Sequence, residues 1–189
     1  MSTSPHPAHH SERSTDNPDE IFDLVDENDD VIGTVRRGDA HQNPSLLHRS
    51  VQVVVLDSAG RLLLQLRSQR KDLFPGYYCA SASGHVISGE DYETTARREL
   101  VEELGVSIAP VFLGKALVRS AFETEITALY VARSDGPFQF DPVETDGGAF
   151  FSWDELMSAR ERLPMTPALL AALDELGRLI DAGELALPW

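Results

Sequence analysis

Three glutamates lie close together in residues 91–104, a segment whose apolar residues recur with helical spacing. They are Glu99, Glu102 and Glu103. At about 100° per residue they share one sector of a helix, beside an apolar stripe that contains Leu100 and Leu104. Like charges at these spacings destabilise a bare helix by about 0.2–0.5 kcal/mol per pair. A bound divalent cation would compensate, since oxygen ligands suit such ions; the alternative is an ordinary solvated face.

The residues before these glutamates add fixed spacing to the pattern. Gly84 is followed after five residues by Glu90, and after seven more by the pair Arg98-Glu99. Residues 84–106, GHVISGEDYETTARRELVEELGV, thereby match the pattern G-x5-E-x7-R-E-U-x-E-E-x-G-U, where U is apolar. This segment resembles the signature of the Nudix hydrolase family.

The resemblance implies a loop–helix–loop site that binds Mg²⁺ or Mn²⁺. Its metal ligands would be Glu99, Glu102 and Glu103, with the backbone at Gly84 close to the metal. Glu90 and Arg98 would pair to hold the loop against the helix. Gly84 and Gly89 would serve as turn glycines that let the backbone approach metal and phosphates closely.

The implied reaction is attack of water on a phosphorus atom of a diphosphate. Metal ions would neutralise phosphate oxygens and lower the pKa of the water, and a general base would complete the site. Glu102 and Glu103 are the candidates inside the signature. Glu144 is a candidate outside it, at a place where the family often supplies a base; an ordinary loop acid is the competing interpretation.

A second resemblance covers about residues 36–168 and points to one branch of the family, the isopentenyl-diphosphate isomerases. Those enzymes bind a metal with three His and two Glu. The aligned positions here are His41, His48, His85, Glu123 and Glu125, which include every histidine outside the N-terminal 18 residues. Imidazole and carboxylate suit Mn²⁺, Zn²⁺ or Mg²⁺. The alternative is a set of unrelated polar side chains.

The same alignment assigns three bases to the substrate. Arg37, Arg67 and Lys71 match isomerase positions that hold the diphosphate, and cationic side chains are what such a site needs in an acidic protein. Ordinary surface bases are the alternative interpretation.

Three departures argue against the isomerase reaction. The isomerase catalytic cysteine falls at Ser83 and its tryptophan at Ala168. Arg and Tyr of the isomerase helix are replaced by Glu99 and Glu102. A carbocation mechanism needs an acid and an aromatic face, whereas hydrolysis needs clustered carboxylates, so a diphosphate hydrolase is the leading hypothesis. An isomerase with relocated groups, Cys79 or Tyr78, and a non-catalytic nucleotide-binding module are the alternatives.

The elements that must position these residues alternate between strand and helix patterns. Strands are expected at 21–25, 31–35, 50–56, 61–67, 111–118, 123–132 and 148–151. Helices are expected at 91–104, 153–162 and 167–182. Strands 21–25 and 31–35 form one hairpin and 50–56 and 61–67 another. Glu123 and Glu125, two apart in a strand, would face the same side. The fold class is α/β, a Nudix-type α/β/α sandwich with a mixed β-sheet.

Composition limits the class of protein and its partners. The chain has 189 residues and a net charge of −15, from 31 acidic and 16 basic residues. Residues 1–18 read as a flexible tail, and 19–189 as a single domain. So acidic a surface makes duplex nucleic acid a poor ligand. No apolar run is long enough to span a membrane, no secretory signal is visible, and the single cysteine fits a reducing cytoplasm. The expected partner is a small diphosphate; its identity and the oligomeric state stay open.

Overall fold

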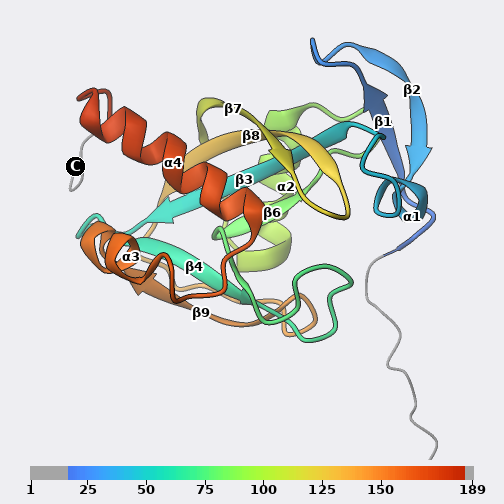
Figure 1. The fold of residues 1–189 in the computed structure, drawn as a ribbon. Coiled ribbons are helices and arrows are strands. Elements are labelled where there is room, and N and C mark those ends of the chain that lie inside the picture. Colours follow the sequence, from blue (N-terminus) through green and yellow to red (C-terminus); the bar gives the residue numbers. More distant parts are fainter. Residues whose placement is uncertain (1–16, 186–189) are drawn as a thin grey trace, which may run out of the picture.

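The computed structural model describes residues 17–185 and shows a mixed sheet between helices (Figure 1). The strands are β1 (Ile21–Val25), β2 (Val31–Arg36), β3 (His48–Leu56), β4 (Leu62–Arg67), β5 (Tyr78–Cys79), β6 (Ala82–His85), β7 (Val111–Arg119), β8 (Thr124–Arg133) and β9 (Thr145–Phe151). The helices are α1 (Arg37–Ala40), α2 (Tyr92–Leu104), α3 (Trp153–Ala159) and α4 (Pro167–Asp181). The predicted tail, apart from residues 17 and 18, lies outside the described residues.

The main sheet is built around a parallel pair, β3 and β8. Its seven strands have the path β5-β4-β3-β8-β7, with β6 also paired to β3 and β9 to β4. The other pairs of this sheet are antiparallel. In the parallel pair His48 lies beside Glu125, and β6 brings His85 opposite Ser50. Residues far apart in the chain therefore meet at one end of β3.

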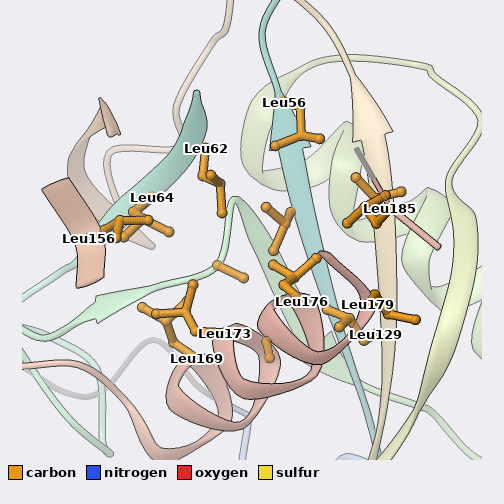
Figure 2. Close-up of a cluster of buried hydrophobic side chains, with 14 of the residues drawn as sticks. Leu56, Leu62, Leu64, Leu129, Leu156, Leu169, Leu173, Leu176, Leu179 and Leu185 are labelled. Atoms are coloured by element: carbon orange, nitrogen blue, oxygen red, sulfur yellow. The ribbon is translucent and has the colours of Figure 1, made fainter. Parts of the chain in front are cut away.

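Alternating residues of β3 pack into two apolar clusters, one on each face of the sheet. Val54 and Leu56 join α3 and α4 in a leucine-rich cluster, which Figure 2 shows around Leu173 and Leu176. Val53 and Val55 face α2, whose residues Ala96, Leu100 and Leu104 are fully buried. A strand buried on both faces is typical of a sheet covered by helices on both sides. The prediction of an α/β/α sandwich is confirmed.

Helix α2, which carries the three glutamates, has both ends fixed. The Asp91 side chain accepts a hydrogen bond from Thr94 N–H and caps the first turn. Gly105 ends the helix in the left-handed conformation, at φ 68°.

The β1–β2 hairpin forms a separate two-stranded sheet that is anchored at its turn. Asp29 has φ 68°, and its carboxylate accepts hydrogen bonds from Arg49 Nε (2.6 Å), Tyr92 Oη (3.0 Å) and Lys115 Nζ (2.5 Å). These partners come from β3, α2 and β7. The hairpin is therefore tied to three elements of the main body.

Most predicted elements are present, although several begin or end one to three residues away from the prediction; β3, for example, begins at His48 rather than at residue 50. Helix α3 ends at Ala159 rather than Arg162, and β9 begins at Thr145, three residues earlier than expected. Strand β8 begins at Thr124, so Glu123 lies just before it. The short elements α1, β5 and β6 were not predicted, because two to four residues carry too little periodicity. Among residues 17–185, no helix has both the length and the apolar character that a membrane span requires.

Candidate active site

One cavity of about 410 Å³ brings the two predicted groups of acids together. Carboxylates from α2 and the loop before β9 line one part of it, and a His/Glu group lines another. The three basic side chains that were predicted to bind phosphate also line it, as does Arg98. The lining side chains from these groups are Glu99, Glu102, Glu103, Glu144, His41, His85, Glu123, Glu125, Arg37, Arg67 and Lys71. Its size falls within the usual range for small-molecule sites.

The three glutamates of α2 differ in exposure. Glu99 and Glu103 are buried, whereas the side chain of Glu102 is 56% exposed. Arg98 lies among them: its guanidinium is 2.7 Å from Glu99 Oε1, 3.0 Å from Glu102 Oε2 and 3.2 Å from Glu90 Oε2. It also donates to the carbonyl oxygen of His85. Arg98 thus ties the helix to the strand and loop before it.

The prediction that Gly84 is a turn glycine is wrong, because Gly84 lies in strand β6. A Cβ atom at this position would lie 1.9 Å from Glu99 Oε1. Glycine is therefore required here because the Glu99 carboxylate packs directly on the backbone. Gly89, with φ 89°, does have the left-handed backbone expected of a turn glycine.

Glu103 is held by two hydrogen bonds. Gln65 Nε2 donates to its Oε2 (2.7 Å) and Ser83 N–H to its Oε1 (3.3 Å). Burial, followed by the neighbouring Glu99, raises the pKa of Glu103 well above its ordinary value. Burial also raises the pKa of Glu99 to about 7, although Arg98 acts in the opposite direction. Buried carboxylates this close together are neutralised either by a proton or by added positive charge.

The second group, the His/Glu cluster, consists of His41, His48, His85, Glu123 and Glu125. One ligand atom from each of the first four lies within 4.8 Å of the others. Glu125 adjoins them, with Oε1 3.2 Å from His85 Nε2 and 3.9 Å from His48 Nε2. Glu123 and Glu125 both approach His85, as expected for side chains on one face of the sheet.

The donor atoms of the His/Glu cluster fit a metal ion. His48 Nε2 and Glu123 Oε2 are buried and have no hydrogen-bond partner among the described residues. Burial, then the neighbouring His85, lowers the pKa of His41 to about 3, so its imidazole is neutral at pH 7, as a ligand must be. Burial lowers the pKa of His85 too, but the neighbouring carboxylates of Glu123 and Glu125 outweigh it and the net shift is upward. The cluster therefore already favours one positive charge between its carboxylates.

Phe22 of β1 packs beneath the His/Glu cluster. Its ring stacks on His85 with centroids 4.7 Å apart and on His48 at 5.3 Å. Phe22 is fully buried, so the hairpin forms one wall of the cluster.

The three bases that were predicted to bind phosphate are positioned by polar neighbours. An Arg37 NH group lies 3.3 Å from Glu20 and 3.3 Å from His85 Nδ1. Lys71 Nζ lies 2.6 Å from Glu144 Oε2. Arg67 donates from Nε and from its second NH group to the carbonyl oxygen of Leu73, at 3.1 and 3.0 Å.

The positions of the isomerase groups are also clear. Ser83 and Ala168 both line the cavity, so the residues that replace the isomerase cysteine and tryptophan face the site. Cys79 lines the cavity too, but burial raises the pKa of its thiol to about 12. Tyr78 is not among the residues that line the cavity; it packs instead against Phe151 and the leucine-rich cluster of α3 and α4. Tyr78 is therefore not a replacement acid for this cavity, which corrects one alternative.

Sequence reasoning missed two supporting residues. Gln65 donates a hydrogen bond to Glu103, and it could have been noticed because it is a polar residue within the apolar run of β4. Phe22 carried no such signal, because an aromatic residue in a strand indicates only a core position.

The sequence and the fold of this chain are similar to those of known proteins. Residues 46–172 match the model of the NUDIX domain family. The chain is 34% identical over 183 residues to the isopentenyl-diphosphate Delta-isomerase of Streptomyces griseus subsp. griseus, covering 92% of each chain. It is 44% identical over 121 residues to an uncharacterized Nudix hydrolase of Streptomyces coelicolor, covering 62% of this chain and 66% of that one. A crystal structure of a Deinococcus radiodurans protein has a TM-score of 0.72 at 29% identity, covering 82% of this chain and 98% of that one.

Proposed function

This chain belongs to the NUDIX domain family and is a hydrolase of diphosphate bonds, and from that premise we propose a substrate of the nucleoside diphosphate-X type. One observation carries the proposal: acidic side chains for a divalent metal and basic side chains for phosphates line the same cavity. Nudix enzymes use divalent metals, and this net charge of −15 would repel an anionic substrate without local cations.

Two sets of residues would hold metal ions. Glu99, Glu102 and Glu103, beside the Gly84 backbone, would hold Mg²⁺ or Mn²⁺, and their fit rests on the crowded, buried carboxylates of α2. The His/Glu cluster would hold a second ion (Mn²⁺, Zn²⁺ or Mg²⁺), and its fit rests on clustered ligand atoms, two of them buried without a hydrogen bond. When bound, such ions neutralise phosphate oxygens and lower the pKa of a coordinated water.

The side chains of the chain itself supply binding and proton transfer. Arg37, Arg67 and Lys71 bind the phosphate oxygens and hold the diphosphate in the cavity. A water oxygen forms a bond to one phosphorus, the bridging P–O bond breaks, and two phosphate-bearing products leave. A carboxylate accepts the proton of the attacking water.

Three carboxylates are candidates for that proton acceptor. Both oxygens of Glu103 already accept hydrogen bonds from Gln65 and Ser83, which suits a fixed ligand. Glu102 and Glu144 line the cavity with greater exposure and each forms an ion pair, with Arg98 and Lys71. These two are therefore favoured over Glu103 as the base.

The isomerase reaction is the second candidate, because several curated relatives that match 82–92% of this chain carry that name. The His/Glu cluster agrees with it. Ser83 and Ala168, however, put neither a thiol nor an aromatic face at the aligned positions, and the Cys79 thiol is a weak acid with a pKa of about 12. Hydrolysis gives a role to more of the side chains that line the cavity than isomerisation does.

The test incubates the full chain with a panel of nucleotide sugars, dinucleotides, coenzyme A and isopentenyl diphosphate, first with Mg²⁺ and then with Mn²⁺. We expect phosphate or nucleoside monophosphate from at least one nucleotide compound. Formation of dimethylallyl diphosphate without hydrolysis would instead support the isomerase.

A matched pair of variants on α2 links the activity to the site. Glu103→Gln should lower kcat at least about 100-fold, because loss of a ligand charge disturbs the reacting groups. Glu93→Gln is the control, since Glu93 is on the same helix but exposed and paired with Arg97. Equal activity of both variants would contradict the proposed site. Retained ligand binding without turnover in Glu103→Gln would exclude a non-catalytic binding module.

A further inference from the structure

Gln52 is a buried polar residue in the middle of β3 that has no role in the site described above. It is 5% exposed and lines the catalytic cavity. Its Oε1 atom is buried and has no hydrogen-bond partner among the described residues. Folding therefore takes this acceptor out of water without returning a hydrogen bond, which costs free energy. Such a group in the wall of a cavity requires an explanation.

Alternation along β3 places Gln52 on the face of the sheet that α4 covers. Val54 and Leu56 pack with α3 and α4 on this face, over which Figure 1 shows α4. Residues two apart in a strand share a face, so Gln52, Ser50 and His48 continue the same row toward the start of β3. Gln52 is therefore the last polar side chain of this row between the His/Glu cluster and the leucine-rich cluster.

The neighbours of Gln52 on this face do not supply a donor to its oxygen. Ser50 Oγ and Thr127 Oγ1 lie 2.8 Å apart and are hydrogen bonded to each other. Leu129, beside Gln52 in β8, is apolar. Ser83 is opposite Gln52 in β6 and lines the cavity, but it is not bonded to this oxygen. The donor for Gln52 Oε1 therefore has to come from whatever occupies the cavity.

The chemistry of an amide oxygen restricts what that donor can be. A carbonyl oxygen only accepts hydrogen bonds, and ionised phosphate oxygens only accept them too. An alkyl chain supplies no donor. A hydroxyl group supplies one, and it can also accept from the amide nitrogen. Since Arg37, Arg67 and Lys71 line the same cavity and suit the phosphates, Gln52 is left for the organic group.

We propose that Gln52 is a specificity-determining residue, whose Oε1 accepts a hydrogen bond from a hydroxyl of the organic group that the diphosphate carries. The inference rests on the proposed function and adds the feature by which the same cavity selects among diphosphates. A plain alkyl chain would fill the cavity and leave the oxygen unpaired. A site built to bond a substrate hydroxyl discriminates strongly against analogues that lack it. The cavity therefore disfavours prenyl diphosphates.

The test compares Gln52→Met with Gln139→Met. Methionine keeps the length of the side chain and removes the amide. Gln139 is the control because it is exposed and lies outside the residues that line the cavity. With UDP-glucose and ADP-ribose, Gln52→Met should raise KM by about 10-fold and leave kcat within about twofold. The KM for inorganic pyrophosphate, which carries no organic group, should change in neither variant.

The same kinetics identify two other roles for Gln52. An equal rise in KM for pyrophosphate and for UDP-glucose would show that the amide binds phosphate. A fall in kcat for both compounds at unchanged KM would show that it positions the attacking water. Either result, or constants that remain at the wild-type values, would overturn the proposal.

Thermal denaturation of the ligand-free protein separates recognition from a structural role. Gln52→Met replaces an amide with an unpaired oxygen by an apolar side chain, so its melting temperature should equal or exceed that of the wild type. A lower melting temperature would show that Gln52 serves the fold and would overturn the proposal. Gln52→Glu retains an accepting oxygen, and its added charge acts on all anionic substrates. The ratio of kcat/KM for UDP-glucose to that for pyrophosphate should therefore stay within about threefold of the wild-type ratio in this variant.

The failure of this inference can be told apart from failure of the proposed function. If the wild-type chain cleaves none of these compounds, the proposed function fails. Calorimetric titration of ADP-ribose and of dimethylallyl diphosphate into wild type and Gln52→Met still tests the inference in that case. The dissociation constant should rise for ADP-ribose alone. Equal constants for ADP-ribose in the two proteins, no binding of it by the wild type, or an equal rise for both compounds would overturn the inference.

Discussion

At the scale of single residues, the site contains positions where a larger side chain would clash with a functional group. Gly84 shows this most clearly, because the Glu99 carboxylate occupies the space of a side chain. The requirement is steric and not conformational, since Gly84 lies in strand β6.

Gly84→Ala should therefore lower kcat/KM by about 100-fold, because a displacement of about 1 Å at a reacting group can cost that much. The added methyl group should also lower the free energy of unfolding by about 1–3 kcal/mol, as overpacking does. Steady-state kinetics and thermal denaturation measure the two effects. Gly33→Ala in β2 is the control, because no atom lies within 4 Å of its added Cβ. Normal activity of Gly84→Ala would show that Glu99 is not needed in this position.

Cys79 gives a second prediction at this scale. Its thiol has a pKa of about 12 because it is buried, so about one molecule in 10,000 carries a thiolate at pH 8. Ellman's reagent should label no thiol in the folded protein within minutes and one thiol in guanidinium. Rapid labelling of the folded protein would contradict this burial and would favour a role for Cys79 as an acid.

At the scale of elements, the β1–β2 hairpin matters because it carries Phe22 beneath two histidines of the His/Glu cluster. Asp29 at its turn anchors it to three elements through bonds to Arg49, Tyr92 and Lys115.

Asp29→Asn should lower the free energy of unfolding by about 1–3 kcal/mol, because partly buried cationic partners lose their charge-assisted bonds. Asn tolerates the left-handed backbone, so the effect comes from charge. Asp30→Asn is the control, since Asp30 is a neighbouring exposed acid. Chemical denaturation at pH 7 measures both. Equal stability of the two variants would show that the turn is not anchored through this carboxylate.

The same variant predicts a pH dependence. Burial raises the pKa of Asp29, but hydrogen bonds from Lys115, Arg49 and Tyr92 outweigh it, so the folded value lies below 3.8. A carboxyl with a lowered folded pKa stabilises the protein above its unfolded pKa and loses that contribution as the pH falls. The stability difference between wild type and Asp29→Asn should be constant from pH 5 to 8 and shrink below about pH 4. A difference that grows on acidification would contradict the assignment.

The elements also show what sequence alone could predict. Helix α2 was predictable because a capping Asp91, an apolar stripe and Gly105 agree with each other. The hairpins were predictable from their turn residues. The meeting of the two acidic groups was not, because it depends on parallel pairing of β3 with β8, some 77 residues apart. Such pairing leaves no local pattern, and the resemblance to isomerases supplied what periodicity could not.

At the scale of the whole molecule, net charge governs stability as well as ligand binding. A net charge of −15 produces self-repulsion that opposes the compact state. The local bases of the cavity do not remove this global effect.

The melting temperature should therefore rise as NaCl increases from about 0.01 to 0.15 M, over which the Debye length falls from about 30 to 8 Å. Differential scanning calorimetry at pH 7.5 in the presence of a chelator measures the effect without divalent ions. A melting temperature that falls over this range would show that attractive ion pairs outweigh the repulsion.

The pairing of β3 with β8 has one more consequence. His48 and Glu125 are neighbours only in the observed register, and a slip of one residue would turn one of the two side chains to the opposite face of the sheet. The protein therefore couples its chemistry to its own correct assembly: a molecule misaligned by a single step would lose the His/Glu cluster, however compact it remained. Catalytic competence in such a chain is a stricter criterion of accurate folding than compactness or helix content.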